Sequence, residues 1–160
     1  MRRGLRIAGH PVHAPLTDFP IVLFLLWVVL DALALGLDAP VLWSAGRWAQ
    51  ILGLIAAGLA ATAGFIDYLG VAESAPRALR TATAHLAVML SVTCIAAIDL
   101  VYRGATFPTG AGRVLHIAAL VLVAGGIGIG GWLGGHLVFH FGVGVDPDAG
   151  AGRADREAPR

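Results

Sequence analysis

Four long apolar stretches, separated by short polar connections, make up most of the chain. A membrane-spanning helix needs about twenty mostly apolar residues, and the stretches at 19–37, 48–66, 81–102 and from 114 onward are long enough. The last stays uncharged as far as Val145, so we expect its C-terminal part to leave the membrane as an interfacial extension. Asp18 lies just before the first stretch and is expected to cap that helix, after an irregular, proline-rich entry segment.

The connections at residues 38–40, 73–76 and 108–112 are short and contain proline or glycine. Short connections join antiparallel neighbours. We therefore predict an all-α integral membrane protein, an antiparallel four-helix bundle with both termini on the same side, formed by residues 1–145. The small and polar residues 146–160 are predicted to be a disordered tail.

The arginines orient the predicted bundle in the membrane. All eleven basic residues are arginines, and the side opposite the termini holds three of them, Arg47, Arg103 and Arg113. Because cytoplasmic loops carry an excess of basic residues, both termini are predicted to be cytoplasmic. Trp43 and Trp48 are expected at the opposite interface, as part of an aromatic belt.

Composition supports a membrane location and excludes some functions. The chain is 58% hydrophobic and 13% charged, with a mean hydropathy of +0.80. Its net charge of +1 argues against nucleic-acid binding. Cys94 is the single cysteine, so no internal disulfide forms, and we expect it to be a small buried residue. No phosphate loop, nucleophile elbow or dinucleotide fingerprint is found, which leaves open whether the protein is an enzyme.

The antiparallel topology brings five candidate ligands to one end of the bundle. His10 and His13 precede the first span, Asp67 closes the second, His85 opens the third and His136 closes the fourth. Ionisable groups in a bilayer are costly and usually functional. All five could bind a transition-metal ion, and His85 with His136 could instead be the axial ligands of haem b. Either cofactor would suit electron transfer with redox partners in the membrane.

Two other interpretations of the polar residues stay open. The cluster could be a structural hydrogen-bond network in a non-catalytic accessory or assembly subunit, because buried polar groups tie membrane helices together. Asp31 and Asp99 could instead carry protons in a transporter, although an interhelical polar tie is the simpler role. Their candidate partners on that side of the membrane are Arg47, Arg103, Arg113 and His116. His116 is otherwise predicted to be alone on its helix face.

Gly126, Gly130 and Gly134 recur every four residues and form a smooth stripe on the fourth span. Such a stripe lets another helix approach closely. Tight packing inside the bundle is the simplest interpretation. The stripe could also mediate homo-oligomerisation, or leave room for a flat cofactor beside His136, next to Gly134 and Gly135.

Several motifs resemble the bacterial membrane family called domain of unknown function 2231. They are GHPVHAPLTDFPIVL, the segment 64–68, His85 and GWLGGHLVFHFGVGVD. The resemblance implies a multi-pass protein of the bacterial cytoplasmic (inner) membrane with no established activity. Some relatives resemble fusions with a Rieske-type iron–sulfur domain, which favours a redox setting. The motif residues carried onto this chain are His10, Pro11, His13, Asp67, His85, Gly134, Gly135, His136 and Gly142.

The chain departs from the family motif at two positions. Ala14 separates His13 from Pro15, where the motif places proline directly after the histidine. His140 occupies a position where arginine is expected, so its i, i+4 spacing from His136 carries little weight. The motif also admits glutamate at the position of His136, which favours a metal or proton site over haem.

Overall fold

A computed structural model describes residues 5–7 and 10–145 of the chain and contains four long helices. They are α1 (His13–Leu37), α2 (Pro40–Ser74), α3 (Leu79–Tyr102) and α4 (Gly110–Phe139). All four are long and apolar enough to cross a membrane. Before α1, strand β1 (Arg6–Ile7) pairs antiparallel with β2 (His10–Pro11). The tail predicted for residues 146–160 lies outside the described residues.

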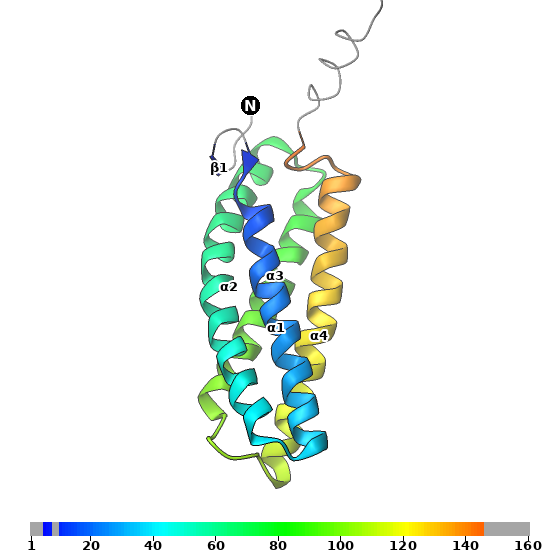
Figure 1. The fold of residues 1–160 in the computed structure, drawn as a ribbon. Coiled ribbons are helices and arrows are strands. Elements are labelled where there is room, and N and C mark those ends of the chain that lie inside the picture. The colour runs from blue at the N-terminus through cyan, green and yellow to red at the C-terminus, as the bar shows by residue number, and fades with distance from the viewer. Residues whose placement is uncertain (1–4, 8–9, 146–160) are drawn as a thin grey trace, which may run out of the picture.

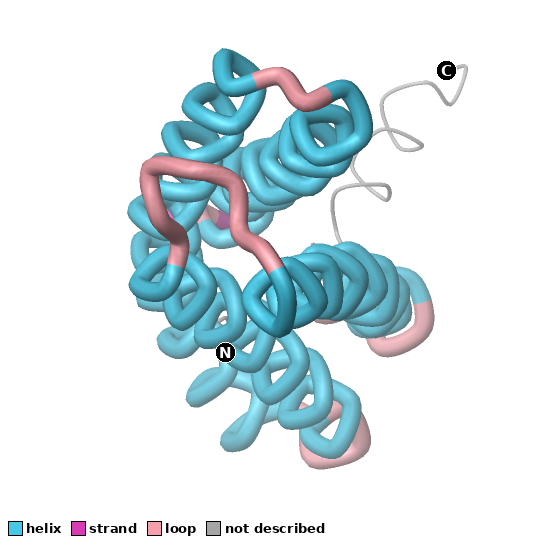
Figure 2. The backbone as a smooth tube through the Cα atoms, turned by 90° about the horizontal axis from the view of Figure 1, so that it is seen from below, coloured by secondary structure: helices cyan, strands magenta, loops and turns pink. Residues whose placement is uncertain are grey.

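The helices run side by side, up and down along the length of the molecule (Figures 1 and 2). The start of α1 and the end of α4 therefore lie at the same end, which we call the entry end, and the α1–α2 and α3–α4 turns lie at the far end. This confirms the predicted antiparallel bundle. Helix α1 packs mainly against α2, and α3 packs mainly against α4, whereas α1 and α4 touch each other much less.

Helix α1 begins earlier than the sequence pattern indicates. It starts at His13, with Val12 as the N-cap residue, so the prediction that Asp18 caps this helix is wrong. The irregular entry segment is also shorter than expected. Pro15 fits because the N–H groups of a first helical turn have no partner within the helix, and Pro20 lies inside the helix.

Helix α2 extends beyond its predicted span at both ends. It begins at Pro40, which occupies a first-turn position that suits proline, and it contains 35 residues. At 1.5 Å per residue its length is about 52 Å, more than the ~30 Å hydrocarbon core. Helix α4 ends at Phe139, and the chain then folds back, with the Val143 N–H donating to the Leu137 carbonyl at 3.0 Å. The predicted interfacial extension is thus a turn packed on the entry end.

Apolar side chains fill the middle of the bundle. Phe24, Trp27, Val92 and Val123 belong to one core cluster and are nearly inaccessible to solvent. Phe24 lies so close to Gly53 that a Cβ there would be 2.7 Å from the Phe24 ring. The small residue therefore sets how closely α1 and α2 approach.

The glycine stripe of α4 packs against α3, as its simplest interpretation predicted. A Cβ at Gly126 would overlap Val92, and one at Gly130 would overlap Met89. At Gly134 a Cβ would lie 3.3 Å from the His85 ring. The space beside Gly134 that the alternative interpretation would leave for a flat cofactor therefore holds the His85 side chain.

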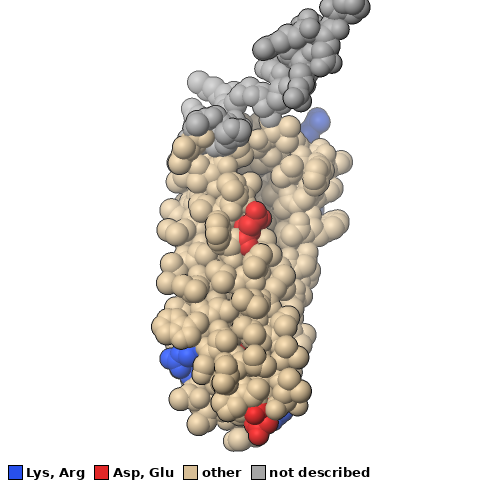
Figure 3. Space-filling view, viewed as in Figure 1, with Lys and Arg blue, Asp and Glu red and all other residues tan. Residues whose placement is uncertain are grey.

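The outer surface is overwhelmingly uncharged on the face that Figure 3 shows. Large apolar side chains such as Val41, Val101 and Val121 are exposed there or on other faces of the bundle, at 80%, 80% and 65%. Lipid is the solvent that such a surface requires. Cys94 is also exposed, so the prediction that it is buried is wrong. It lies on a part of α3 that does not face the core.

Candidate functional site

The predicted ligand His13 is tied to the backbone of α2. Its Nδ1 lies 3.0 Å from the carbonyl oxygen of Ala60. The ring fits against Gly64, where a Cβ would be 2.6 Å from its Cε1 atom. Because a carbonyl only accepts, Nδ1 carries the proton in this hydrogen bond, and Nε2 keeps its lone pair when the ring is neutral.

His85 repeats this arrangement on the other pair of helices. Its Nδ1 lies 2.9 Å from the carbonyl oxygen of Gly130 on α4, and the ring rests on Gly134. His13 begins α1 and His85 lies near the start of α3, so the structure places both predicted ligands at the entry end.

The other predicted ligands make different contacts. Asp67 accepts a hydrogen bond from the Leu5 N–H at 2.9 Å, which fastens the entry segment to α2. His136 stacks between Trp132 and His140, with ring centroids 5.6 Å and 4.5 Å away. The side chain of His10 lies outside the described part of the chain. Among the described residues, no three His, Cys, Asp or Glu side chains are grouped to hold a metal ion.

A second polar site lies inside the bundle toward the far end. Asp31 of α1 is fully buried and forms a two-pronged ion pair with Arg103, which follows α3. One arm of this pair joins Arg103 Nη2 to Asp31 Oδ1 at 2.7 Å. Arg103 also donates to the carbonyl of Trp43 on α2. The expected pairing of Asp31 with an arginine from this side is thus confirmed for Arg103.

His116 of α4 lies between the two buried carboxylates. Its Nδ1 is 2.7 Å from Asp99 Oδ1, and its Nε2 is 3.2 Å from Asp31 Oδ2. The second distance is short enough for an ion pair, but the two groups are not oriented for a hydrogen bond. The prediction that His116 is alone on its face is wrong, because rotation of α4 turns the ring into the core. We call Asp31, Asp99, Arg103 and His116 the buried ionic cluster.

Three further side chains complete the surroundings of the buried ionic cluster. Trp27 Nε1 donates to Asp31 Oδ2 at 2.6 Å, from one turn earlier on α1. Gln50 Nε2 donates to Asp99 Oδ2 at 2.9 Å and to the Ala96 carbonyl at 3.1 Å. The guanidinium carbon of Arg103 lies 3.7 Å from the centre of the Trp43 ring, a cation–π contact.

The two tryptophans of the expected aromatic belt have different environments. Trp48 is 64% exposed, as an interfacial residue would be, but Trp43 is only 3% exposed. Trp43 lies at the predicted end of the bundle, but its ring faces inward and covers the Arg103 guanidinium, so it does not belong to a belt that faces lipid.

Charge in the buried ionic cluster balances when His116 carries two protons. Two carboxylates then face one guanidinium and one imidazolium, all in a region of low dielectric constant where an uncompensated charge is costly. Asp31, His116 and Asp99 form a continuous series of contacts across three helices. His116 and Asp99 can share one proton in this arrangement. The cluster joins α1, α3 and α4, and Gln50 and Trp43 connect it to α2.

Sequence reasoning missed Gln50 and Trp27 as parts of this site. Gln50 is the amide in a span without charges, and a fully buried amide in a membrane helix requires partners. Trp27 lies four residues before Asp31, the spacing that places two side chains on one helix face. Both signals were present in the sequence, although neither identifies the partner.

The polar residues at the entry end and the buried ionic cluster are separated by the apolar core. Along α3, the rise from His85 to Asp99 is about 21 Å at 1.5 Å per residue. Phe24, Val92 and Val123 lie in the core between them. The bundle therefore contains two separate polar sites, and not one continuous series of polar side chains from end to end.

Comparison with protein families supports the resemblance of the motifs. Residues 9–147 match the model of a family described as predicted membrane protein, DUF2231. This match covers all four helices and both terminal motifs. Comparisons with curated proteins and with solved structures gave no match.

Proposed function

Since the chain belongs to the DUF2231 family of predicted membrane proteins, we propose that it is a non-catalytic accessory or assembly subunit, a helical scaffold within the membrane. One observation carries this proposal: polar side chains at both ends of the bundle are hydrogen-bonded to a different helix. At the entry end, His13 joins α1 to α2 and His85 joins α3 to α4. Toward the far end, the buried ionic cluster joins the helices through charge pairs.

The arrangement favours a structural role because His13, His85 and the charged groups of the buried ionic cluster all direct polar atoms toward groups on other helices. Interhelical hydrogen bonds of this kind stabilise membrane bundles by roughly 0.6 kcal/mol each, up to about 2 kcal/mol. A rigid exterior made of apolar side chains is what a partner helix or lipid would contact. The orientation that the arginines predict, with both termini in the cytoplasm, would place the entry end on the cytoplasmic side.

A transition-metal site at His13 and His85 is a second candidate, favoured by one specific observation. Histidines that bind metals usually donate the other ring N–H to a carbonyl or carboxylate, which fixes the ring. Both rings donate from Nδ1 to a helix carbonyl, which leaves Nε2 available as a ligand. The close contact of His85 with Gly134 favours an ion over haem, because a macrocycle would need that space. Such an ion would give the redox role expected from the sequence a physical basis.

One experiment separates the two candidates. The protein is purified in mild detergent, and its metal content, its absorption spectrum in both redox states and its thermal unfolding are measured, together with those of His85→Ala. His140→Ala is the matched control, because that ring is exposed at the end of α4. A scaffold predicts no bound metal and a lower unfolding temperature for His85→Ala alone.

The contrary result is a stoichiometric metal ion, or a haem absorption band, that disappears in His85→Ala without loss of stability. That outcome would contradict the scaffold function and support a cofactor site at His85. An accessory role also predicts that the protein, solubilised from its native membrane, migrates within a larger complex. A particle of monomer size would contradict that part of the proposal.

A further inference from the structure

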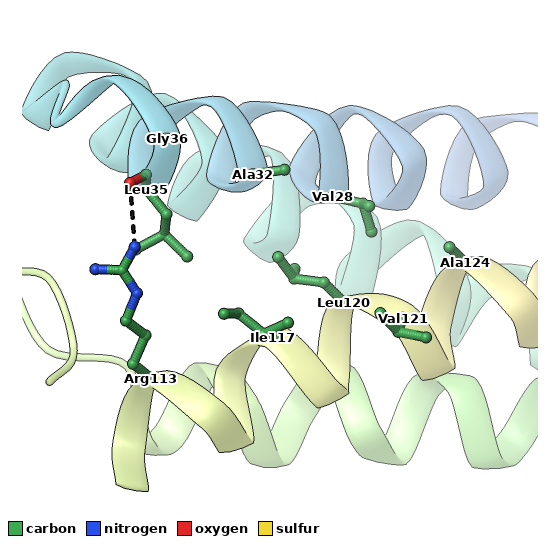
Figure 4. A pocket seen from close by; sticks show the side chains of 9 residues that line it. All are labelled: Val28, Ala32, Leu35, Gly36, Arg113, Ile117, Leu120, Val121 and Ala124. Atoms are coloured by element: carbon green, nitrogen blue, oxygen red, sulfur yellow. Dashed lines mark hydrogen bonds between the residues drawn. The ribbon is translucent and has the colours of Figure 1, made fainter. Parts of the chain in front are cut away.

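An apolar groove opens between α1 and α4 in the half of the bundle nearest the far end (Figure 4). Its volume is about 440 Å³. The groove exists because α1 and α4 make few contacts with each other, and because small residues leave the α1 wall flat. Its lining residues are Val28, Ala32, Leu35, Gly36, Arg113, Ile117, Leu120, Val121 and Ala124.

The length of the groove matches one leaflet of a bilayer. From Arg113 to Ala124 the rise along α4 is about 16 Å at 1.5 Å per residue. Half of a hydrocarbon core of ~30 Å is about 15 Å. Because Arg113 lies near the start of α4, the groove runs from the membrane interface at the far end toward the middle of the bilayer.

The lining of the groove suits a hydrocarbon chain. Apart from Arg113, all of the residues that line it are apolar or glycine, and they come from two neighbouring helices. A single acyl chain is the apolar object in a membrane that can lie lengthwise in a groove between two adjacent helices.

Arg113 supplies a charged group at the interfacial end of the groove. Its guanidinium donates one long hydrogen bond, of 3.3 Å, to the Leu35 carbonyl (Figure 4). Arg113 is exposed, and no other hydrogen bond of its guanidinium is found among the described residues. A guanidinium presents five N–H donors in a fork that suits phosphate oxygens.

We propose that this groove binds one acyl chain of an anionic glycerophospholipid, whose phosphate is held by Arg113. The apolar walls of the groove bind the acyl chain, and Arg113 favours a lipid whose headgroup carries a net negative charge. This site is separate from the buried ionic cluster and from His13 and His85, so it stands whether or not the proposed scaffold function is correct.

Native mass spectrometry of the protein in detergent tests the proposal. Phosphatidylglycerol and phosphatidylcholine with identical acyl chains are added in equal amounts, and retained lipid is counted. The wild type should retain one phosphatidylglycerol molecule with about fivefold preference, the size expected for one arginine near an anionic headgroup. Arg113→Gln should remove the preference. Gly36→Leu should lower retention of both lipids severalfold, because a Cβ at Gly36 meets nothing within 4 Å and the side chain fills the groove.

Two controls match these variants. Arg47→Gln removes an exposed arginine of α2 at the same end of the bundle. Gly58→Leu adds a side chain where a Cβ also meets nothing within 4 Å, on a helix that does not line the groove. Both should bind lipid as the wild type does. Equal retention of the two lipids by the wild type, a preference that survives Arg113→Gln, or a protein dimer that Gly36→Leu dissociates would each overturn the proposal.

Discussion

Replacement of Arg103 by methionine is expected to destabilise the bundle strongly. Asp31 would keep the hydrogen bond from Trp27 at 2.6 Å and the 3.2 Å contact with His116. It would lose both arms of its ion pair, and the Trp43 carbonyl would lose a donor. Removal of one partner from a buried ion pair costs about 3–5 kcal/mol, because the remaining charge stays buried and uncompensated. That is a large part of a typical stability of about 5–15 kcal/mol.

The double variant Asp31→Asn with Arg103→Met provides the decisive comparison. It removes one negative and one positive charge together, so His116 and Asp99 remain as a balanced pair at 2.7 Å. We therefore expect the double variant to lose less stability than the sum of the two single losses, by about 0.5–3 kcal/mol, the range of coupling energies between residues in contact.

Unfolding by SDS in mixed micelles, followed by circular dichroism, measures these free energies. Arg47→Gln is the control, since Arg47 is exposed on α2 and a surface substitution changes stability by about 0.5 kcal/mol or less. The reasoning would be refuted if Arg103→Met were as mild as this control. It would also fail if the double variant lost the sum of the two single losses, because the charges would then act independently.

Two further predictions concern packing and orientation. Gly46→Ala should destabilise by about 1–3 kcal/mol, since its Cβ would overlap the Asp31 carboxylate, whereas Gly58→Ala should be neutral or stabilising in the same unfolding assay. Equal effects of the two substitutions would contradict the observed approach of α1 and α2. If both termini are cytoplasmic, a cysteine at Ala105, in the exposed α3–α4 connection, should react with a membrane-impermeant maleimide in intact cells, in a Cys94→Ser background. Labelling only after the cells are broken would reverse the orientation.

Much of the fold was predictable because the bilayer restricts the possible structures. The lengths of the apolar stretches identify the four helices, and the short connections make them antiparallel. The errors fall at helix ends and on helix faces. Asp18 lies inside α1 because proline is tolerated in a first turn, and Cys94 is exposed because one apolar residue in a span cannot be distinguished from another by hydropathy.

The candidate sites were less predictable, for a different reason. Topology correctly brought His13 and His85 to one end, but it could not show that each ring donates to a helix carbonyl. That contact depends on Gly64 and Gly134, whose missing side chains admit the rings. The position of His136, which is half-buried and stacked on Trp132, depends on the rotation of α4.

The pattern of apolar stretches is enough to identify four membrane spans and the relative level of each polar group, because that level follows from position along a helix. Which of those groups meet depends on the tertiary structure. By its level along the helices, Asp31 could have paired equally well with Arg47, Arg103 or His116. In the structure, Arg103 and His116 contact its carboxylate, whereas Arg47 is exposed. The choice depends on the rotation of each helix about its axis. Close packing at small residues such as Gly46 fixes that rotation.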